Sequence, residues 1–390
     1  MATLLFILAD RLSLLADKGE MTARYYNPGD VFDDVHLLTT SNDLVDPARI
    51  AITAGRARLH VHRLWQGDDR VNMALSPVLA GRWARRAIDL ARRIDIDAVR
   101  TGDRVTGYLG ARISEEIGVP HVLSLHADRE DHLQRLGQGP HRWLMKWELR
   151  YARYAMPRAD TVIAVYESLR TYAAACGARN VEVVYNAICP TRETAKQDYG
   201  LAAPPRVVSV GRQIRGKEPL ALIRAFQDLD ARLVLIGDGE AHQDLRRLVE
   251  QLKLEEKVEF IESMANEQLC ETLTDYDLFA VHNAYPGIPK TVMEALWLGL
   301  PVVINRDQVR PVPELSGEWL DRVDNTVEGY QGSLRRLLGD AQARAELGQR
   351  GRAYAEATFA PRQAEERQAD VYRRLLASSP QEGDTATCPS

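Results

Sequence analysis

The stretch RVVSVGR, residues 206–212, joins a short β-branched run to a glycine and then to a positive charge. This pattern predicts a buried strand that ends in a loop. Arg212 and Lys217 both follow the strand at its carboxyl end. Open α/β sheets bind their ligands at the carboxyl ends of the strands, and both side chains are cationic. The segment therefore predicts a site for a diphosphate, with Gly211 at the start of the loop.

A second segment with the features of a phosphate site is GIPKTVMEALWLG, residues 287–299. It predicts a helix with Pro289 in its first turn and Gly299 just past its end. The amides of Lys290 and Thr291 would then face an anion, and the helix dipole would favour its binding. We expect this helix to contribute to the same diphosphate site, with Gly287 in the loop that leads into it.

Glu294 lies one turn further along this helix. A carboxylate in this place can accept hydrogen bonds from both hydroxyls of a ribose, as acidic residues do in other nucleotide-binding folds. Taken singly, a loop Arg or Lys and a helical Glu are more often exposed surface. Their order along the chain (strand, loop, helix, acid) is the order that a sugar-nucleotide site requires.

Strand-like runs alternate with helical patterns along the whole chain, which is typical of parallel sheets with right-handed crossovers. The sequence therefore predicts an α/β protein. The predicted strands are residues 4–8, 35–39, 58–61, 98–100, 121–125, 161–165 and 181–184, followed by 206–210, 232–236, 258–261, 278–281 and 301–304.

Composition narrows the class of protein. The chain has 390 residues, which exceeds one typical core and predicts two domains. Its net charge of −5 gives no electrostatic case for nucleic acid. The four cysteines are scattered without metal-like spacing, and the first apolar run is too short for a membrane span and lacks the features of a signal peptide. We expect a reduced, cytoplasmic protein.

At these residues the chain resembles the retaining family 4 glycosyltransferases. The resemblance covers nearly the whole chain, and its most specific motifs are VGR at 210–212 with Lys217, LIGDG at 235–239, VEFI at 258–261, YDLF at 276–279 and EALWLGLPVV at 294–303, preceded by ADTVIAV at 159–165 and VYNA at 184–187. It implies the GT-B fold: two Rossmann-like domains whose parallel sheets face an interdomain cleft.

The resemblance also implies a domain plan and a set of roles. An acceptor-binding domain would span residues 1–187 and a donor-binding domain 188–360. A helix over 361–378 would cross back to the first domain, before a disordered tail at 379–390. Arg212 and Lys217 would hold the donor diphosphate as catalytic residues, Glu294 the ribose, and the main chain near Ile261 the base.

One position departs from the family pattern. The family usually carries two glutamates eight residues apart, and Pro286 lies eight residues before Glu294. Proline has no side-chain group that could bond a sugar hydroxyl, so the usual contact with the transferred sugar is missing or supplied differently. We interpret this as a trait of a subgroup.

The first domain carries fewer signals. Gly19 and Glu20 follow the first strand, where the family places a glycine-bearing loop near the reacting sugar. His126 closes the run at 121–125 and matches a family histidine that faces the cleft, so we expect it to bond the donor sugar. Three nearby alternatives stay open: Asp103, Glu130 and His132.

The predicted activity is transfer of a sugar, with retention, from a nucleoside diphosphate donor to a hydroxyl acceptor. A UDP-sugar is favoured as donor, in glycan, polysaccharide or glycolipid biosynthesis, with no cofactor and no metal. Two alternatives remain: a nucleotide-sugar epimerase of the same fold, and a non-catalytic nucleotide-sugar-binding or scaffold protein, which Pro286 would favour. The basic, tryptophan-containing stretches at 81–93 and 142–158 suggest peripheral contact with the inner face of a membrane.

Overall fold

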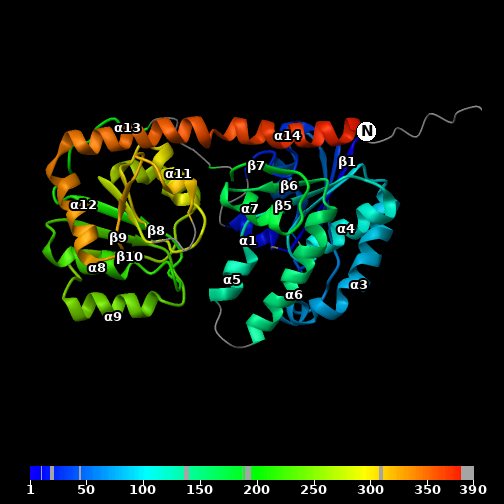
Figure 1. Ribbon diagram of the computed structural model, residues 1–390, viewed down its shortest axis with the longest axis horizontal. Helices are drawn as coiled ribbons and strands as arrows, with labels where there is room; N and C mark the ends of the chain where they lie inside the picture. The colour runs from blue at the N-terminus through cyan, green and yellow to red at the C-terminus, as the bar shows by residue number, and fades with distance from the viewer. Residues whose placement is uncertain are drawn as a thin grey trace, which may run out of the picture. The chain divides into compact units, whose positions relative to one another are not determined.

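The computed structural model describes residues 1–9, 11–17, 22–43, 45–135, 140–186, 188, 195–306 and 311–378. The chain divides into two compact units. The first comprises residues 1–165, 169–184 and 365–390, and the second comprises residues 166–168 and 185–364. Each unit is built around its own parallel sheet (Figure 1).

The first unit contains a seven-stranded sheet in the order β3-β2-β1-β4-β5-β6-β7, and all of its neighbouring strands pair in parallel. Such a sheet is buried on both faces, and accordingly every residue of β1 and β2 is buried. Its strands are β1 Thr3–Leu8, β2 Asp34–Thr39, β3 Arg58–Arg63, β4 Ala98–Gly102, β5 His121–Leu125, β6 Thr161–Ala164 and β7 Val181–Val183.

Three helices, α3, α4 and α6, pack on one another beside this sheet (Figure 1). Helices α3 and α4 form a common core with Leu5 and Ile7 of β1 and Val99 of β4. The helices up to residue 175 are α1 Leu12–Asp17, α2 Pro47–Ile50, α3 Asp69–Ile94, α4 Val105–Ile117, α5 Arg129–Arg135, α6 Pro140–Ala155 and α7 Ser168–Ala175, with 3-10 turns at Pro28–Asp30, Ala51–Ala54 and Met156–Arg158.

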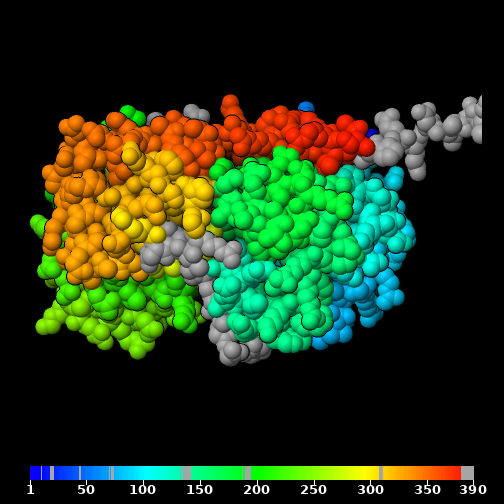
Figure 2. All heavy atoms as spheres, in the orientation of Figure 1, coloured from blue at the N-terminus to red at the C-terminus, as the bar shows by residue number. Residues whose placement is uncertain are grey.

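The last helix, α14 Pro361–Ser378, belongs to the first unit from Glu365 onward and lies at its surface in Figure 2. The ring of Tyr372 packs edge-on against Phe32 at 5.0 Å between centroids. Gln368 accepts a hydrogen bond of 2.9 Å from Arg100 on β4. The chain thus returns to its first unit after completing the second.

The second unit contains a six-stranded parallel sheet in the order β10-β9-β8-β11-β12-β13, with an apolar core on each face. Its strands are β8 Arg206–Val210, β9 Arg232–Ile236, β10 Val258–Ile261, β11 Leu278–Val281, β12 Val302–Asn305 and β13 Asp321–Val323. Its helices are α8 Leu220–Ala225, α9 His242–Leu252, α10 Asn266–Thr272, α11 Lys290–Trp297, α12 Val327–Gly339 and α13 Ala341–Thr358, with 3-10 turns at Phe226–Asp228, Leu273–Asp275 and Pro313–Leu315.

The predicted parallel α/β architecture is confirmed, and every strand predicted from the sequence is present to within two residues at either end. The edge strand β13 was not predicted, because its three residues, Asp-Arg-Val, form no apolar run. The helix predicted over 289–299 is α11. It begins at Lys290, with Pro289 as its N-cap rather than in its first turn.

Candidate active site

The loop after β8 is held at the carboxyl edge of the second sheet by hydrogen bonds to the end of β9 and to the loop that follows it. Gly211 N–H donates to the Ile236 carbonyl at 3.0 Å, and Gln213 donates through its side chain to the Gly237 carbonyl at 2.7 Å. Gly237 has a φ of 138°, and a Cβ there would collide with the Gly211 carbonyl. The two loops therefore pack more closely than any residue but glycine permits at position 237.

Lys217 lies at the end of this loop, half-buried, while Arg212 is exposed. The Nζ atom of Lys217 lies 5.2 Å from the centroid of the Tyr285 ring. Burial, together with the charge of Arg212, lowers the pKa of Lys217 to about 8. The two cations are close enough to repel each other, and Lys217 is partly withdrawn from water. An anionic ligand would therefore stabilise this site.

The depressed pKa of Lys217 predicts a pH dependence of ligand binding. A bound diphosphate favours the protonated amine, so it should raise this pKa back toward the ordinary value of about 10.4. As pH rises through 8, Lys217 loses its positive charge in the free protein before it does so in the complex. Affinity for a nucleoside diphosphate should therefore fall by up to about tenfold per pH unit between roughly pH 8 and 10. Calorimetric titration from pH 7 to 9.5 measures this. Lys217→Arg is the control, since it keeps its charge and should show a flat profile.

The start of α11 lies against the end of β8. Thr291 Oγ1 donates to the Val210 carbonyl at 3.2 Å, and the N–H groups of Val292 and Met293 both donate to the Pro289 carbonyl. The amides of Lys290 and Thr291 precede these bonds, in the first turn, where helix amides are available to an anion. The structure thus brings the two segments predicted to bind diphosphate to the same edge of one sheet.

Glu294, one turn into α11, is only 2% exposed. Its Oε1 accepts a hydrogen bond of 3.0 Å from Asn266 Nδ2 and lies 3.7 Å from Lys290 Nζ. Asn266, the first residue of α10, therefore orients the carboxylate. The sequence analysis missed this residue, because an Asn at the start of a helix usually reads as a cap.

Asn283 holds the loop that carries the proline departure. Its side chain donates to the carbonyls of Tyr285 and Gly287 at 3.1 and 2.9 Å, and its backbone is fixed on both sides by the amide of Asn305. A Cβ at Gly287 would lie 2.9 Å from the Tyr166 ring, so this position also requires glycine. Asn283 and Asn305 were missed because lone asparagines at strand ends carry no motif.

Ile261 ends β10, and its carbonyl accepts a hydrogen bond of 2.8 Å from Gly237 N–H. The half-buried side chain packs on the core between the sheet and α11. Gly211, Gly237 and Ile261 thus follow one another along the carboxyl edge of β8, β9 and β10, the edge where a nucleotide predicted from the sequence would lie.

In the first unit, a cavity of about 260 Å³ opens at the carboxyl ends of β1, β4 and β5. It is lined by Tyr25, Tyr26, Ser124 and the exposed His126, among others. His126 therefore faces a cavity at the sheet edge where the sequence predicts an acceptor site. Gly19 and Glu20 lie outside the residues that the structure describes, as does the side chain of His132.

A buried ion pair lines this cavity. Arg129 donates to both oxygens of Asp103, at 2.6 and 2.8 Å, and the two side chains are 9% and 3% exposed. Burial opposes ionisation of Asp103, but the charge and hydrogen bonds of Arg129 outweigh it and hold the pKa of Asp103 below its ordinary value. Of the sequence alternatives to His126, Asp103 thus lines the cavity as a carboxylate, whereas Glu130 pairs with Arg153 at 2.7 Å.

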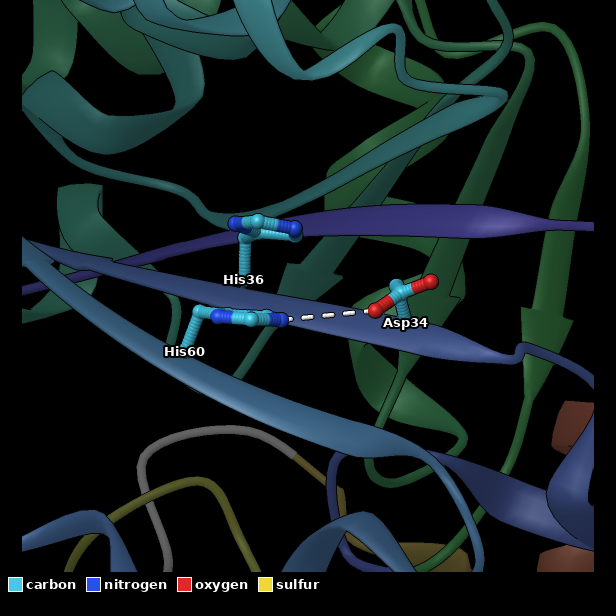
Figure 3. A group of neighbouring side chains, drawn as sticks. All are labelled: Asp34, His36 and His60. Carbon is cyan, nitrogen blue, oxygen red and sulfur yellow. Dashed lines mark hydrogen bonds and ion pairs between the residues drawn. The ribbon is translucent and has the colours of Figure 1, made fainter.

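One group of described side chains has the composition of a metal site: Asp34, His36 and His60, on β2 and β3 (Figure 3). Arg58, however, already donates to both oxygens of Asp34, at 2.8 and 2.5 Å. The rings of His36 and His60 lie within 14° of parallel, 4.3 Å apart, so their nitrogen lone pairs do not converge on one point. The group is a hydrogen-bonded stack, and it lies outside the donor loops.

Two solved structures share the fold of this chain. A sucrose-phosphate synthase from Thermosynechococcus elongatus superimposes with a TM-score of 0.76 at 16% identity, covering 97% of this chain and all of that one. Anabaena HepE in complex with UDP-glucose superimposes with a TM-score of 0.71 at 18% identity, covering 96% of this chain and 100% of that one. The chain has the GT-B fold, as predicted.

The family follows from the sequence. Residues 33–192 match "Glycosyltransferase Family 4", and residues 191–354 match "Glycosyl transferases group 1". The chain belongs to the family 4 glycosyltransferases. None of the helices in the described part of the chain is both long and apolar enough to cross a bilayer.

Two curated relatives illustrate the range of the family. An N-acetylgalactosaminyltransferase of Campylobacter jejuni, whose name gives a diphospho-undecaprenol acceptor, is 31% identical over 173 residues, which is 43% of this chain and 46% of that protein. The lipopolysaccharide core biosynthesis glycosyltransferase LpsE of Rhizobium meliloti is 26% identical over 344 residues, 84% of this chain and 96% of that protein. The first relative is thus matched over about half its length, and LpsE over nearly all of it.

Proposed function

We propose that the protein transfers a sugar from a nucleoside diphosphate donor to a hydroxyl acceptor, with retention at the anomeric carbon. The observation that carries this proposal is the grouping of Arg212, Lys217 and the start of α11 at the end of β8. A cationic edge next to a buried carboxylate, Glu294, suits a diphosphate followed by a ribose.

The proposed chemistry concerns the leaving group. The bond between the anomeric carbon and the diphosphate oxygen breaks, and negative charge accumulates on the diphosphate. Arg212 and Lys217 would stabilise this charge. The acceptor oxygen bonds the anomeric carbon on the same face, and its proton passes to the departing phosphate, so no protein nucleophile is needed. His126 would bond the donor sugar. With the charge balanced by side chains and amides, we propose a reaction that requires no metal and no cofactor.

The relatives support a choice of substrates. HepE is known in complexes with UDP and UDP-glucose, which favours uracil as the base and a UDP-sugar as the donor. The names of the Campylobacter and Rhizobium relatives point to a lipid-linked or lipopolysaccharide acceptor. We therefore propose a cytoplasmic enzyme of glycan or glycolipid biosynthesis. The basic residues of α3 and α6, with Trp143 54% exposed on α6, would support peripheral contact with an anionic membrane.

Nucleotide release separates this function from its two alternatives. A glycosyltransferase should release nucleoside diphosphate from its donor only when acceptor is present, and proton NMR of the first product should show the donor's anomeric configuration. Turnover of the donor without acceptor would indicate an epimerase. Donor binding without turnover, over a panel of acceptors, would favour the scaffold protein that Pro286 suggests. An inverted product would contradict the retaining mechanism.

A further inference from the structure

A second cavity, of about 800 Å³, lies in the first unit between the edge strand β3 with its following loop and the helix α3. Its volume is within the range of small-molecule sites. Four arginines and one histidine line it, opposed by a single carboxylate, and two tryptophans, Trp65 and Trp83, complete its wall. The arginines are Arg63, Arg82, Arg86 and Arg93, the histidine is His62, and the carboxylate is Asp89.

Among the described residues, the arginines that α3 contributes to the cavity lack a carboxylate partner. Within the described residues, no ion pair joins Arg82, Arg86 or Arg93 to an acid, and the hydrogen bond from Arg86 to the Leu64 carbonyl is long, at 3.4 Å. By contrast Arg92, on the same helix but outside the cavity, pairs with Glu116 at 2.8 Å. Unpaired like charges around one cavity repel each other, so an anion placed among them would be stabilised.

The strand side of the cavity ends in the histidine stack. His62 Nε2 lies 2.9 Å from His36 Nδ1, and His36 in turn stacks on His60, which contacts Asp34 (Figure 3). Burial, together with the charges of His60 and Arg93, lowers the pKa of His62. A ligand that brings negative charge would relieve the effect of Arg93 and favour protonation of this ring.

We propose that the cavity between β3 and α3 binds a phosphate-bearing ligand, with the phosphate held by Arg86 and Arg93 and the rest of the ligand beside Trp65. Guanidinium groups bind phosphate through paired N–H donors, and an indole offers a flat apolar surface to the remainder of a ligand. The cavity belongs to the first unit, whereas the donor loops belong to the second. The phosphate is that of a soluble glycosyl phosphate or of a lipid headgroup.

The test uses inorganic pyrophosphate as the probe and a full-length Arg212→Ala/Lys217→Ala protein, which removes the donor diphosphate site from the measurement. Tryptophan fluorescence and calorimetry follow the titration. Adding Arg86→Gln/Arg93→Gln should weaken binding at least tenfold. The matched control, Arg85→Gln/Arg92→Gln, removes two charges from the same helix outside the cavity and should change binding less than twofold. All four side chains are exposed, so melting temperatures should stay close.

A second arm identifies the source of the phosphate. Vesicles of phosphatidylcholine with 30% phosphatidylglycerol are compared with phosphatidylcholine alone by sedimentation. Loss of pyrophosphate binding in Arg86→Gln/Arg93→Gln supports the site and assigns a soluble ligand. Loss of binding only to anionic vesicles also supports the site and assigns a lipid ligand. The proposal is overturned if neither probe binds, or if the control double variant loses as much binding as the cavity variant. Donor binding in the unmodified protein is scored separately, so a failure of the proposed function would be distinguishable.

Discussion

Replacing Arg212 or Lys217 with alanine should lower kcat by about 10²–10³-fold while leaving the fold intact. Both cations lie at the loop after β8, where charge would develop on the leaving diphosphate, and removing one donor aimed at developing charge typically costs this much. Steady-state kinetics with saturating donor measure the effect. A larger change in kcat than in KM would show that the cations act chiefly on the transition state.

Arg215→Ala is the matched control for these variants. Arg215 lies on the same loop and is exposed, and its recorded contacts, with Glu240 and Tyr285, use only main-chain atoms that alanine keeps. Its kcat should stay within about twofold of wild type. If Arg215→Ala lost as much activity as Arg212→Ala, the effect would be one of net charge rather than of position, and the assignment of the diphosphate site would be wrong.

The second large effect concerns stability. Arg129→Met should lower the free energy of unfolding by about 3–5 kcal/mol, because it leaves the buried carboxylate of Asp103 without its partner. Replacing both members, as Asp103→Leu/Arg129→Met, should recover much of that loss, since no uncompensated charge then remains. Urea unfolding measures both.

A neighbouring ion pair provides the control for the buried one. Arg153 and Glu130 pair at 2.7 Å, but their side chains are 59% and 35% exposed. Arg153→Met should therefore cost less than about 1 kcal/mol. If it destabilised the protein as much as Arg129→Met, burial would not be what makes the Asp103 pair important.

The sequence predicted those parts of the fold that depend on local pattern. The β-branched run at 206–210 and its counterparts are strands because a parallel sheet buries both faces, which leaves a continuous apolar signal. The three residues of β13 carry no such signal. They form a strand because Val303, Ile304 and Asn305 of β12 present an open edge to them, which is a tertiary cause.

The residues of the candidate site likewise fall into two groups: those that a local sequence pattern predicts, and those that only folding brings together. Gly211 with Arg212, and Pro289 with Lys290, could be proposed from the sequence because the residues of each pair are adjacent in the chain. Asn266, Asn283 and Asn305 could not, since each acts on a residue brought near by folding, as Asn266 acts on Glu294 across 28 positions. The pairing of Asp103 with Arg129 was likewise invisible, because neither residue belongs to a motif.

The proposed function depends on the binding of a nucleoside diphosphate at the end of β8. The most direct measurement is the thermal stabilisation given by a panel of nucleoside diphosphates and their sugars to the wild type and to Arg212→Ala. At 100 times its dissociation constant the correct nucleotide should stabilise the wild type by about 2.7 kcal/mol, and Arg212→Ala should lose most of this effect. Equal stabilisation of both proteins, or of neither by any nucleotide, would contradict the proposed donor site.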